Sequence, residues 1–285
     1  MRPALRILVM NMRALFPALA VASLLSACDR GATAPTLAVP DAPAKITNGS
    51  VDGAAHPAVV LIIMDVAGRP AYRCSGTLIS PTVVLTAGHC AGETGEFSGM
   101  RIFTESDVQN GNNNYPFAGP NTVEATAWHS HPQFTEAAFY LHDVGVVKLS
   151  APVALPTGAT YGTLPAVDAL EALKPSSHTV FTAVGYGLQR INPVFVEREK
   201  IRMVAEPHLI QINTGFTGPG SLLLSNNAST GGTCFGDSGG PNFVGTSSVV
   251  GGVTSFGING NCAGTGGVFR LDKADVLAFV NQYLH

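Results

Sequence analysis

The chain contains the stretch Gly232-Thr233-Cys234-Phe235-Gly236-Asp237-Ser238-Gly239-Gly240-Pro241, in which one serine is flanked by glycine and preceded by aspartate. Glycine at 236 permits backbone torsions that a side chain would forbid, so the amides of Gly236 and Ser238 can converge on one point. Two converging amides form an oxyanion hole, and the serine hydroxyl lies beside it. Alone, the stretch is also compatible with a simple glycine-rich turn. Nucleophilic catalysis requires a base and an acid elsewhere in the chain.

Two further motifs supply those groups. Thr86-Ala87-Gly88-His89-Cys90 follows an apolar run, and Asp143 stands directly before the apolar residues 144–149. Each has an ordinary structural explanation, as a core histidine or as an aspartate at the start of a strand. The order histidine, aspartate, serine, with these three local contexts, resembles that of the trypsin/chymotrypsin family of serine endopeptidases. The resemblance covers roughly residues 46–285.

The resemblance implies a serine endopeptidase that needs no cofactor or metal and acts on protein or peptide substrates. His89 would take the proton of Ser238 as general base and return it to the leaving amine. Asp143 would orient the imidazole and stabilise its charged form. Gly236 and Ser238 would supply the oxyanion hole.

The resemblance also implies an all-β fold, in which two six-stranded antiparallel barrels pack together with a C-terminal helix. The composition agrees, because 32 glycines and 19 prolines in 285 residues favour short strands joined by turns. The barrels would span roughly residues 46–155 and 156–270, and the helix residues 273–284, with Asp272 as its N-cap. No internal repeat is visible, so the number of barrels rests on the resemblance. Apolar runs predict strands at residues 59–64, 74–79, 83–85, 101–103, 144–149, 179–184, 201–205, 222–224, 249–254 and 267–270.

The first 45 residues are predicted to lie outside this domain. A start with three arginines precedes an apolar stretch too short to span a bilayer comfortably, which predicts a signal peptide over residues 1–27. Its end, Leu25-Ser26-Ala27-Cys28, resembles a bacterial lipobox, in which Cys28 would carry a lipid and be the only link to a membrane. Plain secretion is the alternative. Residues 28–45 are predicted to be a flexible tether or propeptide. We therefore expect an exported protein of a bacterial cell envelope, or one secreted after cleavage.

Removal of residues 1–27 takes away three positive charges and no negative ones, so the formal net charge changes from −3 to −6. Nucleic acid binding would require a basic patch, which this balance does not suggest. We expect a monomer.

The junction of Lys45 and Ile46 resembles the activation site of the family. There, cleavage before the isoleucine frees an amine that pairs with the aspartate before the nucleophile, here Asp237. Thr47 and Asn48 depart from the usual residues, and an ordinary strand start after a linker is the alternative. If the junction is cleaved, an activating protease is a further partner.

Five cysteines are present, and four remain if Cys28 is lipidated, which is an even number in an exported chain. Four cysteines allow three pairings, and spacing alone does not choose between them. The resemblance suggests Cys74–Cys90 and Cys234–Cys262. Metal binding is a weak alternative, because no Cys-x-x-Cys or His-Glu-x-x-His motif occurs and we expect the histidines at 129, 131 and 142 to be surface or rim residues.

Family members select the side chain before the scissile bond with a pocket whose floor lies six residues before the nucleophile. Here that residue is Gly232, which cannot pair with Lys or Arg as an acidic residue would. We therefore predict an open, uncharged slot with a preference for large apolar or aromatic side chains, and expect Gly257 and Gly267 to keep it open. The resemblance assigns the rest of its lining to Thr233, Phe235, Ser255, Phe256, Gly257 and Gly267.

Two other functions compete with this prediction. A protease-like binding module would usually have lost a triad residue or the glycine of the oxyanion hole, and this chain keeps all of them. An esterase with a Gly-x-Ser-x-Gly elbow would have its triad in the order serine, acid, histidine, whereas histidine comes first here.

Overall fold

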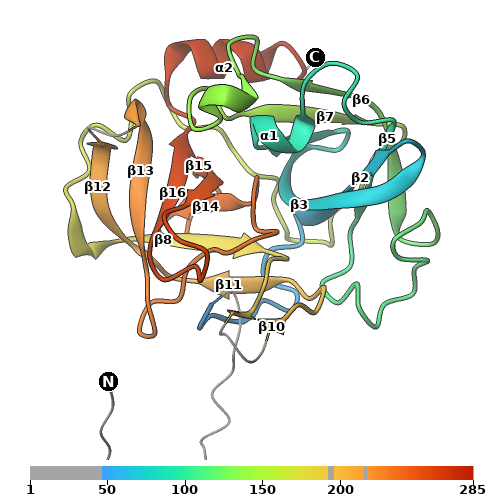
Figure 1. Cartoon of the computed structure of the whole chain (residues 1–285), viewed down its shortest axis with the longest axis horizontal. Helices are drawn as coiled ribbons and strands as arrows, with labels where there is room; N and C mark the ends of the chain where they lie inside the picture. The colour runs from blue at the N-terminus through green and yellow to red at the C-terminus, as the bar shows by residue number, and fades with distance from the viewer. Residues whose placement is uncertain (1–46, 192–195, 215–216, 285) are drawn as a thin grey trace, which may run out of the picture. The chain divides into compact units, whose positions relative to one another are not determined.

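The computed structural model describes residues 47–191, 196–214 and 217–284, which fold mainly into antiparallel strands (Figure 1). The first half of the chain closes a six-stranded barrel in the order β2-β3-β4-β7-β6-β5. Its strands are β2 (Val59–Val66), β3 (Arg69–Ser80), β4 (Val83–Thr86), β5 (Gly99–Phe103), β6 (Thr122–Ser130) and β7 (Gly145–Leu149).

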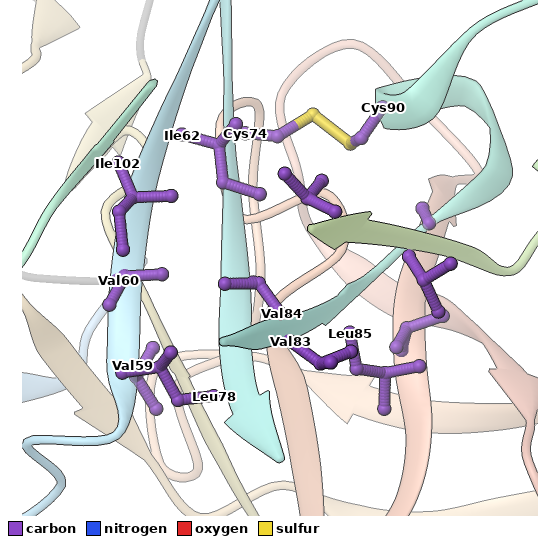
Figure 2. Packing of buried hydrophobic residues seen from close by; sticks show 14 of the residues in the cluster. Val59, Val60, Ile62, Cys74, Leu78, Val83, Val84, Leu85, Cys90 and Ile102 are labelled. Atoms are coloured by element: carbon purple, nitrogen blue, oxygen red, sulfur yellow. A yellow bond between two sulfur atoms is a disulfide. The ribbon is translucent and has the colours of Figure 1, made fainter. Parts of the chain in front are cut away.

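The core of this barrel is built around β2. Its residues 59–64 are at most 2% exposed, and the strand pairs with β3 on one edge and β5 on the other. Figure 2 shows Val59, Val60 and Ile62 of β2 packed among apolar side chains of the neighbouring strands. Burial of each such side chain contributes about 1.5–3 kcal/mol, so this run of six makes β2 a large contributor to the core.

The second half forms a ring of six strands in the order β8-β12-β13-β16-β15-β14, and the pairing of β14 with β8 closes it. The prediction of two six-stranded antiparallel barrels is therefore confirmed. The strands are β8 (Ser176–Gly185), β12 (His208–Thr214), β13 (Gly218–Asn226), β14 (Pro241–Val244), β15 (Val250–Gly257) and β16 (Gly264–Arg270).

The sequence did not predict β6, β12 or β14. β6 carries Glu124 and Thr126 between apolar residues, β12 mixes His208 and Gln211 with isoleucines, and β14 begins at a proline. Short strands with polar residues give a weak apolar signal, and only their pairing partners stabilise them. Four shorter strands complete the description: β1 (Ser50–Val51), β9 (Arg190–Ile191), β10 (Val196–Glu197) and β11 (Met203–Ala205).

The N-terminal segment is tied to the second barrel through β1, which pairs with β11, and through a buried ion pair. The Nε of Arg202 donates to the carboxylate of Asp52 over 2.8 Å, and both side chains are almost fully buried. The same guanidinium donates to the carbonyl oxygens of Gly53 and Val59 over 2.7 and 3.0 Å. Because an unpaired buried charge is costly, this network fixes where the chain enters the domain.

The C-terminal helix α2 (Ala274–Asn281) follows the second barrel but packs on the first. The ring of Tyr283 stacks on His129 of β6 with centroids 5.0 Å apart, and Lys148 of β7 donates to the Tyr283 carbonyl oxygen. The prediction of Asp272 as N-cap is wrong, because Lys273 occupies that position. The buried carboxylate of Asp272 instead accepts a hydrogen bond from Arg270 over 2.8 Å.

Both predicted disulfides are present. Cys74–Cys90 joins β3 to the short helix α1 (Gly88–Ala91), and Cys234–Cys262 joins the serine loop to the connection between β15 and β16 (Figure 2 shows the first). In the entropic model each contributes about 3 kcal/mol for loops of this length. None of the described helices is long and apolar enough to cross a membrane.

Candidate active site

The serine loop is a tight turn that is fixed from both barrels. Gly236 has φ +99° and Gly239 φ +76°, values that favour glycine, and the Asp237 amide donates to the Cys234 carbonyl oxygen over 3.0 Å. The Ser75 amide of β3 donates to the Ser238 carbonyl oxygen over 2.8 Å. The loop of the second barrel is thus anchored on a strand of the first.

The amides of Gly236 and Ser238 donate to no acceptor within the described residues. The neighbouring amides of Asp237, Gly239 and Gly240, in contrast, donate to the carbonyl oxygens of Cys234, Thr254 and Asp237. Ser238 also lines a cavity, so its amide and hydroxyl lie at a surface that a ligand can reach. Two unengaged amides on one turn are what stabilisation of an oxyanion requires.

The carboxylate of Asp143 lies at the other side of the site and is fully buried. It accepts hydrogen bonds from His89 of α1, from the backbone amide over 2.9 Å and from Nδ1 over 3.0 Å. The hydroxyl of Ser255 in β15 donates to the same carboxylate over 2.5 Å. Asp143 therefore holds the imidazole in place, with Nδ1 toward the carboxylate and Nε2 on the opposite side of the ring.

Burial from water lowers the pKa of His89, but the charge and hydrogen bond of Asp143, together with the charges of Glu136 and Glu96, outweigh it and raise the pKa above its ordinary value of 6.5. Its side chain is 23% exposed. His89 is thus a base of increased strength at the surface of the site. Within the described residues, no hydrogen bond joins His89 to the Ser238 hydroxyl; such bonds are often long before substrate binds.

Asp237 is fully buried beside the nucleophile. Burial raises the pKa of Asp237 to about 6, although amide hydrogen bonds from Cys234 and Gly187 and the charge of Arg73 lower it. Those amides donate to its two oxygens over 2.9 and 2.7 Å. No ion pair to Asp237 exists among residues 47–191, 196–214 and 217–284. Ile46 and Lys45 lie outside the described residues, as do Cys28 and the predicted signal peptide.

A cavity of about 240 Å³ opens beside Ser238. Its lining contains no charged side chain, and Phe235 at its rim is 55% exposed. The predicted pocket residues Thr233, Phe235, Ser255, Phe256 and Gly257 all line it, together with Phe139, Cys234, Thr254 and Cys262.

Two of the predicted pocket glycines do not leave open space. The ring of Phe256 covers Gly267, so closely that a Cβ there would lie 2.3 Å from a ring carbon. The side chain of Asn226 fills the space beside Gly232 in the same way. The expectation that Gly267 keeps the slot open is therefore wrong, because an aromatic ring occupies that space.

Asn226 is a residue that the sequence analysis missed. It is buried, its Nδ2 donates to the Thr233 carbonyl oxygen over 2.7 Å, and its Oδ1 accepts from the Thr47 hydroxyl over 2.7 Å. The sequence did contain a signal for its burial. Side chains of a strand alternate between its two faces, so Asn226 lies on the same face of β13 as the buried Leu222 and Leu224. The second missed role is that of the Ser255 hydroxyl, because the sequence analysis assigned Ser255 only to the lining of the pocket.

Cys74, His89 and Cys90 place three ligand-type atoms within 4.8 Å of one another. Both sulfurs are used by the disulfide, so this cluster offers a metal ion only one ligand.

Two closed barrels and a His–Asp–Ser arrangement between them define the trypsin-like class. The trypsin family model matches residues 50–274, and the chain therefore belongs to the trypsin family. Brachyurin of Leptuca pugilator is 29% identical over 199 residues, which cover 67% of this chain and 78% of that protein. Trypsin iota of Drosophila melanogaster is 27% identical over 196 residues, covering 65% and 69%.

Solved structures support the same fold. HL collagenase matches with a TM-score of 0.65 and 20% identity, covering 82% of this chain and 96% of that one. Human heparin binding protein matches with a TM-score of 0.62 and 19% identity, covering 83% and 95%. At this identity the likeness concerns the fold alone.

The pKa of His89 can be tested directly by NMR titration of its imidazole. We expect a midpoint above 6.5, because carboxylates favour the protonated ring, and a lower midpoint in the double variant Glu96→Gln/Glu136→Gln. Glu206→Gln, an exposed carboxylate with no effect on His89, is the control. Identical midpoints in all three proteins would contradict the electrostatic explanation.

The raised pKa of Asp237 predicts how stability depends on pH. Between about pH 4 and 6 the folded chain holds a proton that the unfolded chain releases, so this group's contribution to stability falls by about 3 kcal/mol as the pH rises through that range. In a chain that keeps Lys45, Asp237→Asn should remove this loss. The measurement is urea unfolding from pH 4 to 7, with the exposed Asp168→Asn as control. Parallel profiles for wild type and Asp237→Asn would refute it.

Proposed function

We propose that the protein is a serine endopeptidase that hydrolyses peptide bonds through an acyl-enzyme, with a preference for apolar or aromatic residues before the bond. The observation that carries the proposal is the buried carboxylate of Asp143, which binds His89 of the first barrel and Ser255 of the second at the same time. That arrangement orients the imidazole of a strengthened base, which in this proposal acts on the Ser238 hydroxyl.

In the proposed reaction, His89 Nε2 removes the Ser238 proton while Oγ attacks the substrate carbonyl carbon. The amides of Gly236 and Ser238 stabilise the resulting oxyanion. The imidazolium, stabilised by Asp143, then protonates the amide nitrogen as the C–N bond breaks, and the amine leaves. Water, activated by the same imidazole, hydrolyses the acyl-enzyme and regenerates Ser238. Since the base must be neutral, activity is expected to rise at a pH above 6.5.

The cavity beside Ser238 supports the proposed specificity. Phe139, Phe235 and Phe256 contribute three aromatic rings, and Phe139 lies edge-on to Phe256 with centroids 6.4 Å apart. The lining of the cavity contains no carboxylate that could pair with a Lys or Arg side chain. An uncharged, partly aromatic cavity suits an apolar side chain.

A binding protein without turnover is the second candidate. It is favoured by the missing hydrogen bond between Ser238 and His89, and human heparin binding protein shows that this fold is also found in a protein named for binding. The two candidates differ in whether Ser238 is reactive.

For residues 1–46 we propose a signal peptide (1–27), a lipid on Cys28, a tether (28–45) and an activating cut between Lys45 and Ile46, with the peptidase domain at 46–285. The two disulfides are consistent with an exported chain. The Thr47 hydroxyl donates to the Gly232 carbonyl oxygen over 3.2 Å, which supports the cut by placing the neighbour of Ile46 at the serine loop. An amine there would stabilise the Asp237 carboxylate.

Ser238→Ala and His89→Ala should each lower kcat/KM by about 10⁴–10⁶, because the triad acts as a unit. The exposed Ser229→Ala is the matched control. Peptides with Phe before the bond should be cleaved faster than those with Lys or Asp, and a fluorophosphonate should label wild type but not Ser238→Ala. All proteins are assayed after trypsin has cut before Ile46. Wild-type hydrolysis by purified Ser238→Ala would refute the assignment, and a cut wild type that is inactive and unlabelled would favour the binding protein.

The N-terminal proposals can be tested in one experiment on wild type, Cys28→Ser and Lys45→Gln. Wild type should label with palmitate and fractionate with membranes, and added trypsin should release an active domain that begins at Ile46. Cys28→Ser should be unlabelled, and Lys45→Gln should stay uncut and poorly active. Full activity in a chain that keeps Lys45 would show that the cut is not required. Absence of palmitate from wild type would refute the lipid on Cys28 and favour plain secretion.

A further inference from the structure

The side chain of Arg73 lies against the proposed oxyanion hole. A Cβ at Gly236 would lie 3.0 Å from Nε and 3.5 Å from Nη2 of Arg73, so the guanidinium packs directly on that glycine. Its charge is also felt by the buried Asp237. Arg73 belongs to β3 and immediately precedes Cys74, whose disulfide partner Cys90 follows His89.

These contacts place Arg73 on the leaving-group side of a bound substrate. The residue before the bond would enter the cavity lined by Phe235, Ser255 and Phe256, all from the second barrel. The leaving amine must lie near His89, which protonates it and which belongs to the first barrel. The chain after the bond would therefore run over the first-barrel wall, where Arg73 packs on Gly236 and the Cys74–Cys90 disulfide ties β3 to the helix that carries His89.

The segment that carries Arg198 and Lys200 is linked to the serine loop through two neighbouring residues. The amide and the side chain of Gln189 donate to the carbonyl oxygens of Glu197 and Glu199, and the Leu188 amide donates to the Phe235 carbonyl oxygen. Burial lowers the pKa of Lys200, and the positive charges of Arg73 and Arg198 lower it further, whereas Glu199 raises it. Arg73 and Arg198 form no ion pair with any carboxylate among the described residues. Among the residues that the structure describes, the Lys200 ammonium donates only to the neutral side chain of Gln109, and it lies over the ring of Tyr115. The charges of Arg73 and Arg198 thus both act on Lys200, and the charge of Glu199 counters them there.

Resting on the proposed function, we infer that Arg73, Arg198 and Lys200 form a cationic subsite that selects substrates with an acidic residue at the first or second position after the scissile bond. An extended chain advances about 3.3–3.6 Å per residue, so these positions come within reach of a guanidinium that packs on Gly236. A carboxylate there would accept charge-assisted hydrogen bonds from Arg73 and relieve the repulsion among the three cations. General attraction of anions is disfavoured by the formal net charge of −3.

The test uses pairs of peptides in which one position is Asp in one peptide and Asn in the other. The varied position is each of the first three after the bond and each of the first two before it. At low salt, Asp at the first or second position after the bond should raise kcat/KM about 3- to 5-fold over Asn. Arg73→Gln and Lys200→Gln should each reduce that ratio, as should 0.5 M NaCl, whereas the exposed Lys174→Gln should not. A ratio near 1 in wild type that cleaves neutral peptides would overturn the subsite and leave the peptidase intact.

The affinity of the chain for the same peptides tests the subsite independently of catalysis. Fluorescently labelled Asp and Asn peptides are titrated into the Ser238→Ala chain, and anisotropy should show tighter binding of Asp only at the positions after the bond. Equal affinities would overturn the subsite. Equal gains at every position, or equal competition by a sulfated polysaccharide, would also overturn it, since both indicate unspecific attraction of anions. Failure of wild type cut before Ile46 to cleave any of the peptides would count against the proposed function alone.

Discussion

The buried carboxylate of Asp143 is the contact on which the arrangement of the site depends. It lies at the start of β7 in the first barrel, and it accepts from the imidazole and amide of His89 and from the hydroxyl of Ser255 in the second. A buried carboxylate must be satisfied on most of its lone pairs, so loss of one donor would leave an unpaired charge. The same three bonds orient the histidine and fix the two barrels relative to each other at the site.

The serine loop depends on a second set of contacts between the barrels. Gly239 approaches Thr86 and Ala87, just before His89, so closely that a Cβ would lie 2.0 Å from the Thr86 hydroxyl. The Ser75 hydroxyl donates to the Gly236 carbonyl oxygen and accepts from the Tyr186 amide. These bonds hold the serine loop against β3 and β4. The glycines in this loop thus serve close packing as much as backbone torsion.

Charge is distributed unevenly around this centre. Burial lowers the pKa of His89, but Asp143, Glu136 and Glu96 together raise it by more. Burial raises the pKa of Asp237, and the charge of Arg73 is among the effects that oppose it, so negative charge acts on one residue and positive charge on the other. The cavity beside Ser238 has no charged lining. In our proposals, the uncharged cavity receives the residue before the bond and the cationic side receives those after it, which would orient an extended peptide in one direction.

The sequence by itself determined the fold class, both disulfides and the three residues of the candidate triad. The motifs around His89, Asp143 and Ser238 are local patterns that can be recognised without knowledge of the contacts, and the number of barrels and the cysteine pairing followed from their resemblance to a known family. It did not reveal β6, β12 and β14, whose polar residues become strands only through their partners.

The tertiary structure alone decided what fills the pocket. That Asn226 occupies the space beside Gly232, and that Phe256 covers Gly267, follows from cross-strand packing between β13, β15 and β16. Likewise, Asp272 pairs with Arg270 instead of capping α2, and Arg73 lies on Gly236, 163 positions further along the chain. Contacts between residues so distant in sequence depend on how two closed barrels meet, and no local pattern records that.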